Sequence, residues 1–321
     1  AAPWCTTSAP VHTGSPWPVR KFSFWTWASV QIVRLGRDFA GRRNAFDAFQ
    51  RQLRACLHAG VHGIAILGLA TEVNKLTTEE RSALLDAAAR EVGGRVPLAV
   101  TVAGPSVDAQ IAFVREAERA GASCVILQPP AVASISQDAL LRFFGAVIDA
   151  ASIPVGVQNA PEYIGVGLDI EGIATLLKRH PNFRFLKGEG SALLIRRTIE
   201  HTGTQLAVLN GRAGLELPDN VEAGCAGMIP GAEACDVLAR VWDGLRAGGD
   251  AATRARAEYE KILPLLVFVM QSIDQLLCYG KRLMARRIGL EAVFDREPAQ
   301  APTEFGLACL ERHAAGLGPL S

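Results

Sequence analysis

Short apolar runs alternate with amphipathic helical stretches along most of the chain. From residue 44 onward each run ends in Gly, Pro or Asn, or at a polar residue, and a helical stretch follows. The apolar runs are 63–68, 97–102, 123–128, 153–158, 183–187, 205–210 and 225–230. The helical stretches are 44–59, 78–92, 106–120, 137–150, 170–179, 190–201, 214–222 and 232–247. Continuous apolar strands separated by helices are typical of a parallel sheet that helices cover.

The number of repeats favours a closed barrel over an open sheet. Seven such runs and eight helical stretches fit an eightfold barrel once one further strand precedes residue 44. The candidate is 22–35, where Phe22, Phe24, Val30 and Ile32 share one parity. After residue 248 the pattern is helical only, with amphipathic stretches at 252–279 and 302–315.

The predicted fold is therefore α/β, a (β/α)8 TIM barrel with a C-terminal helical appendage. We expect an irregular N-terminal segment at 1–20, the barrel at 21–248 and helices packed on it at 249–321. Helix-end signals agree. Thr77 and Glu80 have the spacing of a capping box, and the Ala-Gly pairs ending at Gly60 and Gly121 are typical helix stops.

Composition narrows the possible partners and the compartment. The 321 residues carry 33 Lys and Arg against 32 Asp and Glu, a net charge of +1, which gives no reason to expect nucleic acid or an anionic membrane. Seven cysteines without a CxxC pair indicate free thiols in a reducing compartment. No apolar run approaches the roughly 18 residues of a membrane helix, and the first twenty residues lack a signal-like apolar segment. We expect a cytoplasmic protein.

Lys187 is the candidate nucleophile. It closes the run 183–187, and because side chains alternate along a strand it shares one face with Phe183 and Phe185. If Phe185 points into the barrel, Lys187 does too, at the strand end where barrel enzymes place catalytic groups. An inward lysine loses hydration of its charged form, which favours the nucleophilic free amine. A surface lysine at a strand end fits the strand pattern equally well.

Three stretches resemble a known family in their order and spacing. They are 68–72 with the capped helix after it, 158–161 and 185–187. Together they resemble the dihydrodipicolinate synthase / N-acetylneuraminate lyase superfamily of class I, Schiff-base aldolases and dehydratases. The resemblance covers about residues 44–316. It implies a barrel lyase in which Lys187 forms a Schiff base with pyruvate or a related 2-oxo acid and no cofactor takes part.

The resemblance also implies where the substrate binds. Backbone amides of Leu69, Ala70 and Thr71 would hold the substrate carboxylate. Further substrate contacts are expected at the ends of the fifth, seventh and eighth strands. The residues at those ends are Gln158, Gly211 and Met228.

The sequence departs from the family's pattern at the same places. Leu69 and Ala70 stand where the family has hydroxyl residues, and Thr71 stands where it has a second glycine. Gln158 replaces a tyrosine that relays protons, and an amide cannot pass a proton as a phenol does. Tyr163 stands where relatives making dihydrodipicolinate carry an arginine. Dihydrodipicolinate synthesis itself is therefore disfavoured.

Two residues are candidates to relay protons instead. Tyr163 is either a relocated proton carrier or an ordinary loop residue. Glu189 is either a general acid/base at the barrel mouth or an exposed carboxylate at a helix start. We predict that one of the two lies within hydrogen-bond or one-water reach of the Lys187 amine. Glu72 matches the family's glutamate and is expected to brace its loop, and Arg212 is either an anion-binding residue or a surface cation.

Other chemistries find little support. The six histidines show no HxH or HExxH spacing, so we predict no metal site. No GxGxxG follows the first strand, which disfavours a dinucleotide-binding fold. The alternative to a lyase is a diverged member that binds a 2-oxo acid without turnover, since the relay position is Gln158. The apolar helices after residue 252 favour a homo-oligomer, a dimer or tetramer.

Overall fold

Eight parallel strands form one sheet in which each strand pairs with the next in sequence. The computed structural model describes residues 27–29 and 42–320, with the backbone alone for 27–29 and 42–45. The strands are β1 (Trp27–Ser29), β2 (Gly63–Ile66), β3 (Leu98–Val102), β4 (Cys124–Leu127), β5 (Val155–Asn159), β6 (Phe183–Gly188), β7 (Ala207–Asn210) and β8 (Gly227–Met228). The predicted parallel α/β fold is confirmed. β1 falls within the predicted 22–35, whereas Phe22, Phe24, Val30 and Ile32 lie outside the described residues.

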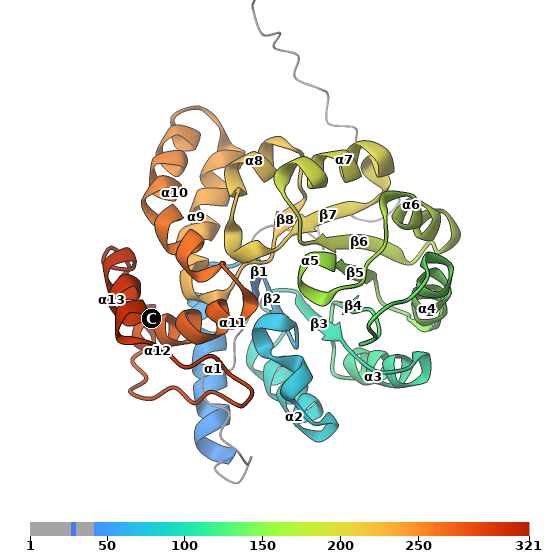
Figure 1. The fold of residues 1–321 in the computed structure, drawn as a ribbon, viewed down its shortest axis with the longest axis horizontal. Helices are drawn as coiled ribbons and strands as arrows, with labels where there is room; N and C mark the ends of the chain where they lie inside the picture. The colour runs from blue at the N-terminus through green and yellow to red at the C-terminus, as the bar shows by residue number, and fades with distance from the viewer. Residues whose placement is uncertain (1–26, 30–41, 321) are drawn as a thin grey trace, which may run out of the picture.

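Helices surround the curled sheet on its outer side (Figure 1). They are α1 (Arg42–His58), α2 (Thr78–Val92), α3 (Val107–Arg119), α4 (Gln137–Ala150), α5 (Pro161–Ile164), α6 (Ile170–Arg179), α7 (Ala192–Thr202), α8 (Leu217–Glu222) and α9 (Cys235–Ala247). Short 3-10 turns lie after the strands or between elements, at η2 (Leu69–Thr71), η3 (Val73–Lys75), η4 (Gly203–Gln205), η5 (Arg212–Gly214) and η6 (Ala232–Ala234). Apart from α5, which was not predicted, these helices agree with the predicted stretches to within a few residues.

The sequence signals at helix ends act as expected. The Thr77 side chain accepts a hydrogen bond from the Glu80 amide at 3.2 Å, and the Glu80 carboxylate accepts one from the Thr77 amide at 2.9 Å. This reciprocal pair is the predicted capping box. Gly60 and Gly121 adopt φ of 77° and 87°, the left-handed conformation that ends a helix.

The inner face of the curled sheet carries a cluster of small and apolar side chains. Its members are Ala65, Ala99, Cys124, Ile126, Phe185, Leu209 and Ile229. Gly156 on β5 allows the Phe185 ring to lie there, because a Cβ at Gly156 would fall 2.2 Å from a ring carbon. The alternation along β6 therefore puts Phe185, and with it Lys187, on the inner face.

The C-terminal region is helical but more broken than the sequence suggested. Its elements are α10 (Gly249–Val269), α11 (Ile273–Gln275), the π-helical η7 (Leu276–Gly280), α12 (Lys281–Arg287) and α13 (Glu304–His313). The predicted continuous stretch 252–279 is wrong. The chain bends by 110° after α10, and Ser272 caps the new helix by accepting a hydrogen bond from the Gln275 amide at 3.0 Å.

Of the helices that the structure describes, none is by itself long and apolar enough to cross a membrane. The helical segments Gly249–Val269 and Ile273–Arg287 reach the length and apolar composition of a membrane span only when the two are counted together across the bend. The cysteines of the described part, from Cys56 to Cys309, are buried free thiols, as predicted. Cys5 lies outside it.

Arg287 fastens α12 to the start of α9. The buried guanidinium donates to both carboxylate oxygens of Asp236, at 2.8 and 2.9 Å, and to the Glu233 carbonyl at 2.7 Å. Burial alone would raise the pKa of Asp236, but the hydrogen bond and charge of Arg287 bring it below its ordinary value. For Glu233 the effect of burial prevails. Burial raises the pKa of Glu233 to about 7, against the lowering effects of a backbone hydrogen bond and the Arg287 charge.

We expect Glu233→Gln to remove a pH-dependent loss of stability. As the pH rises from about 4.5 to about 7, Glu233 ionises in the unfolded chain but keeps its proton in the folded one. The free energy of unfolding therefore falls across this window. Between pH 4.5 and pH 8 the free energy of unfolding of the variant should rise relative to that of the wild type by up to about 3 kcal/mol. Urea unfolding at both pH values measures this, with the exposed Glu260→Gln as the control. Parallel pH profiles for wild type and variant would contradict the expectation.

Candidate active site

Lys187 lies near the carboxyl end of β6, on the inner face of the sheet. In the strand register it is opposite Gln158 of β5 and Leu209 of β7. The residue is 5% exposed and lines a small cavity at this edge of the sheet. The expected inward orientation is confirmed, and the alternative of a surface lysine is wrong.

Glu189, two residues further along the chain, is the partner of Lys187. The Lys187 Nζ lies 2.9 Å from the Glu189 Oε1, and Glu189 is 6% exposed. The predicted contact between the Lys187 amine and one of the two relay candidates is confirmed for Glu189. The alternative of an exposed carboxylate at a helix start is wrong, because Glu189 precedes α7 but turns into the molecule. A carboxylate at this distance can exchange a proton with the amine.

A chain of amides fixes the Glu189 carboxylate. The Gln158 Nε2 donates to the Glu189 Oε1 at 2.8 Å, and the Gln158 Oε1 accepts from the Gln128 Nε2 at 2.9 Å. The Gln110 Nε2 then donates to the Gln128 carbonyl at 2.9 Å. Both ends of the Gln158 amide are thus engaged. Gln158 was predicted to contact substrate, but its contacts in the structure hold Glu189 instead.

Gly211 provides the room for the other oxygen of the same carboxylate. A Cβ at Gly211 would fall 2.8 Å from the Glu189 Oε2, closer than side-chain atoms come in practice. The Arg212 amide lies 3.5 Å from that oxygen. Gly211 was predicted to bind substrate, but its place in the structure is against Glu189.

The cavity beside Lys187 has a volume of about 30 Å³, room for one or two water molecules. Its walls come from the loop after β2, from η5, from the end of β8 and from the C-terminal helices. The lining residues are Leu69, Ala70, Lys187, Glu189, Arg212, Ala213, Ile229, Gly231, Met270, Ile273 and Leu276. Of these, the sequence had singled out Leu69 and Ala70 as substrate-binding.

Thr71 and Met228 lie elsewhere. Thr71 is fully buried, and its amide donates to the Gly68 carbonyl at 3.1 Å, so this amide is already used within the loop. Met228 packs on the outer side of the sheet in a cluster with Leu217 and Trp242. The neighbouring Ile229, and not Met228, lines the cavity beside Lys187. The substrate contact of Met228 stays a prediction.

Tyr163 and Arg212 form a second polar pair at the cavity. Burial lowers the pKa of Arg212, but the hydrogen bond with Tyr163 and the charges of Glu216 and Glu162 more than offset this and raise it. The Arg212 Nη1 donates to Glu216 at 2.7 Å. Tyr163 therefore contacts Arg212, while the contact to Lys187 comes from Glu189. Arg212 has a side chain only 21% exposed, so it is not a simple surface cation.

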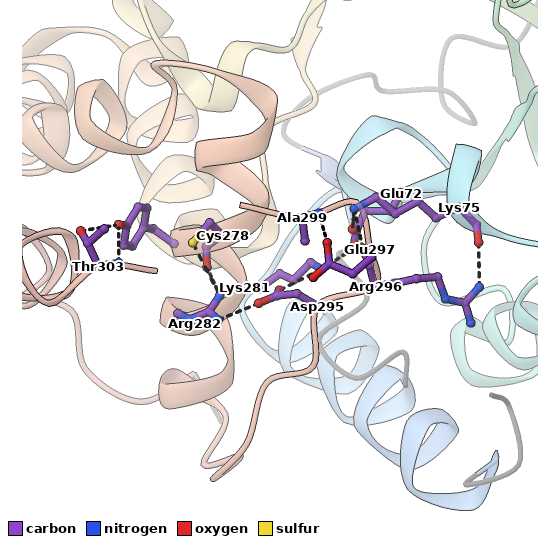
Figure 2. Close-up of polar contacts among 11 residues, drawn as sticks. Glu72, Lys75, Cys278, Lys281, Arg282, Asp295, Arg296, Glu297, Ala299 and Thr303 are labelled. Atoms are coloured by element: carbon purple, nitrogen blue, oxygen red, sulfur yellow. Dashed lines mark hydrogen bonds and ion pairs between the residues drawn. The ribbon is translucent and has the colours of Figure 1, made fainter. Parts of the chain in front are cut away.

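A buried ion-pair network fixes the loop after β2 against the C-terminal helices (Figure 2). Glu72, at φ 55°, pairs with Lys75 at 2.7 Å and with Lys281. Lys281 is 1% exposed and also lies 3.5 Å from Asp295, which Arg282 contacts at 2.6 Å. The expected bracing role of Glu72 agrees with these contacts, and the brace reaches α12.

Arg296 adds a second connection between the same two regions. It donates to both carboxylate oxygens of Glu80, at 2.6 and 2.7 Å, and to the Lys75 carbonyl at 2.7 Å. Lys75 in turn donates to the Arg296 carbonyl at 2.9 Å. Burial alone would raise the pKa of Glu80, but the hydrogen bonds from Arg296 and the Thr77 amide hold it below its ordinary value. The segment before α13 thus fastens the start of α2.

Several residues of the site were not predicted. Gln128, which bonds to Gln158, is the only amide in the apolar run 123–128, and that polar residue was a usable signal. Ile229 follows directly after β8 and joins the inner cluster with Phe185 and Leu209. Met270, Ile273 and Leu276 reach the cavity because of the bend after α10, for which the sequence offered only Ser272 as a cap. Among the residues that the structure describes, no group of three or more His, Cys, Asp or Glu side chains is arranged to hold a metal ion.

Solved structures show which fold this chain has. The chain has the fold of solved dihydrodipicolinate synthase structures. It matches the enzyme from Thermotoga maritima with a TM-score of 0.81 at 19% identity, covering 92% of this chain and 99% of that one. It matches a prophage protein of the dihydrodipicolinic acid synthase family from E. coli K12, solved in complex with pyruvate, with a TM-score of 0.81 at 21% identity, covering 92% and 98%.

The family follows from the sequence comparison. The model of the dihydrodipicolinate synthetase family matches residues 42–303, and the chain belongs to this family. It is 32% identical to the 4-hydroxy-tetrahydrodipicolinate synthase of Stenotrophomonas maltophilia (strain R551-3) over 57% of this chain and 61% of that protein. The Bacillus velezensis protein of the same name is 32% identical over 50% and 56%. The matched regions thus span little more than half the length of these relatives.

We expect Lys281→Met to destabilise the protein far more than Lys75→Met. Both lysines contact Glu72, but Lys281 is the fully buried one, and its loss leaves a buried carboxylate without that compensation. Removing one partner of a buried pair costs about 3–5 kcal/mol, whereas Lys75 is partly exposed and its loss should cost much less. Urea unfolding of the two variants measures the difference. Equal losses would show that the network does not depend on Lys281.

Proposed function

We propose that this protein is a Schiff-base lyase, of the aldolase or dehydratase type, that acts on pyruvate or a related 2-oxo acid. The observation that carries the proposal is the buried Lys187 amine at the carboxyl end of β6, 2.9 Å from the Glu189 carboxylate. In this proposal the sheet closes into a (β/α)8 barrel over 21–248. Lys187 then lies at the carboxyl end of the barrel strands, where such enzymes have their active sites. Residues 1–20 and 249–321 are then additions to the barrel.

Lys187 supplies the covalent chemistry. Its neutral amine attacks the C2 carbonyl of the 2-oxo acid to give a carbinolamine, which loses water to form an iminium. In aldol cleavage the iminium accepts the electrons of the neighbouring C–C bond, and an enamine results; the reverse step forms that bond. In dehydration the iminium accepts the electrons of a C3–H bond as the proton leaves, and the resulting enamine expels the C4 hydroxyl, which departs as water with a proton. Hydrolysis of the iminium returns the free amine, and no separate cofactor is required.

Glu189 moves the protons. The attacking nitrogen must lose a proton and the departing hydroxyl must gain one, and the Glu189 Oε1 lies within hydrogen-bond distance of that nitrogen. A positioned acid/base contributes about 10²–10⁴-fold to such a step. Gln158 and Gln128 act through Glu189, because their hydrogen bonds hold its carboxylate in place. The role that relatives give to a tyrosine is thus taken here by a carboxylate.

Binding requires the cavity to enlarge. A volume of about 30 Å³ holds a water molecule or two, and a 2-oxo acid is larger. Met270, Ile273 and Leu276 form the wall that comes from the C-terminal helices. We expect these three side chains to shift when substrate enters, since the β-strand ends opposite them are fixed by the sheet.

The remaining properties extend the proposal. We expect a cytoplasmic protein. We also expect a homo-oligomer, a dimer or tetramer, and light scattering at micromolar concentrations tests its assembly. The alternative of a member that binds a 2-oxo acid without turnover rests on Gln158 at the relay position. The comparisons lend it no support. Turnover of a panel of 2-oxo-3-deoxy acids separates a lyase from such a binder.

We predict that borohydride with pyruvate traps a stable adduct on Lys187. Intact mass and peptide mapping should show it in the wild type and in the control Lys178→Arg, an exposed lysine on α6. Lys187→Arg should abolish it. Glu189→Gln should slow its formation at least tenfold, because the proton acceptor beside the amine is lost. A wild type that forms no adduct, or forms it on another lysine, rules the proposed chemistry out.

A further inference from the structure

Arg212 is the one cavity residue whose charge the proposed chemistry does not use. Of the eleven described residues that line the cavity, three are charged: Lys187, Glu189 and Arg212. The Lys187 Nζ and the Glu189 Oε1 lie 2.9 Å apart, and each charge compensates the other. The remaining lining residues are apolar or glycine, so they offer an anionic ligand no side-chain donor.

The guanidinium of Arg212 keeps a hydrogen-bond donor unused. Its Nη1 donates to Glu216, and Tyr163 forms a further hydrogen bond with the side chain. The Nε–H is buried, yet among the described residues no acceptor lies within hydrogen-bond distance of it. Leaving a buried donor unmade is costly, most of all in a charged group. Arg212 also lines the cavity beside Lys187, so an anionic ligand that enters this cavity meets a guanidinium with an unused donor.

The backbone that carries Arg212 is strained. Arg212 and Ala213 adopt φ of 50° and 53°, the left-handed region, which side chains other than glycine enter at a cost. Two such residues in succession are held by their surroundings, and strain of this kind concentrates at ligand sites. The Arg212 amide is 3.5 Å from the Glu189 Oε2, so this turn and the relay carboxylate are in contact. The position of the guanidinium is therefore set by the same turn that meets the catalytic pair.

The loop after β2 creates the need for such a cation. Leu69 and Ala70 bring no hydroxyl to the cavity, and the Thr71 amide is bonded to the Gly68 carbonyl. A 2-oxo acid nevertheless carries a carboxylate next to the carbonyl that Lys187 attacks. We propose that Arg212 binds this carboxylate, with Tyr163 and Glu216 as positioning residues that hold the guanidinium. This inference rests on the proposed function, because it names the residue that recognises the acid group of that substrate.

The test compares a substrate with and without the negative charge. Borohydride trapping is followed at increasing concentrations of pyruvate, and separately of methyl pyruvate, whose ester has no carboxylate. Arg212→Met should raise the half-saturating concentration of pyruvate roughly 10- to 100-fold, since a hydrogen bond to a charged group is lost. It should leave methyl pyruvate within about twofold of the wild type. That split distinguishes binding of the carboxylate from general damage to the site.

The matched control is Arg196→Met. Arg196 also pairs with a glutamate four residues on, Glu200 at 2.6 Å, but it is exposed on α7 and lines no part of this cavity. It should change neither substrate. If Arg212→Met affects both substrates equally, or neither, Arg212 does not bind the carboxylate and the inference is overturned.

A second measurement separates this inference from the proposed function. Calorimetric titration of pyruvate into Lys187→Met measures binding without the covalent step, and adding Arg212→Met to that variant should remove it. If the wild type gives no borohydride adduct, the Schiff-base function fails, while the titration still decides the role of Arg212. Pyruvate binding that survives the double substitution overturns the inference whether or not an adduct forms.

Discussion

The buried Glu189 carboxylate constrains the residues at the carboxyl ends of the strands around it. Glu189 is almost fully buried, and an ion taken out of water must regain its interactions from the protein. It does so from Lys187, from the Gln158 amide and from the turn that carries Arg212. These partners come from β5, β6 and η5, so two strands and a 3-10 turn have to converge at one point. Gly211 is part of the same constraint, because any side chain there would overlap the carboxylate.

The second constraint lies on the opposite wall, where the C-terminal helices meet the loop after β2. Glu72 sits in the left-handed region between two short 3-10 turns, and Lys281 from α12 reaches it through the interior. Arg296 and Lys75 exchange hydrogen bonds with each other's backbone carbonyls close by. The wall that contains Leu69 and Ala70 is therefore positioned by residues more than two hundred positions away in the sequence. The cavity is thus formed by the curled sheet and the C-terminal helices together.

The sequence was sufficient where a property is local and repeated. Strand and helix stretches followed from periodicity, the start of α2 from Thr77 and Glu80, and the inward direction of Lys187 from the alternation along β6. It was insufficient where the property depends on a partner from elsewhere. The bend after α10 depends on packing, so the 252–279 stretch was taken as continuous. The cluster that Met228 joins with Leu217 and Trp242 depends on side chains from other helices, which the local pattern does not show. In the same way the Gln158 side chain bonds to Gln128 and to Glu189, which lie 30 and 31 positions away along the chain.

The departures from the family's pattern are related to one another through these contacts. An amide at position 158 cannot shuttle a proton, but it can hold a carboxylate by donating a hydrogen bond to it. A tyrosine hydroxyl could also donate, but it has only one proton. Gln158 has in addition a carbonyl that Gln128 engages, so its orientation is determined, and the carboxylate it holds is the one beside Lys187. A second pair of changes is found in the cavity wall. Leu69 and Ala70 bring no hydroxyl to it, and Arg212 brings a cation. Because Glu189 and Arg212 meet at a single turn, a change in the position of either would disturb the other. If Glu189 carries protons and Arg212 binds an anion, as proposed, both roles depend on one turn, and this favours a site altered for a different ligand over one that has merely decayed.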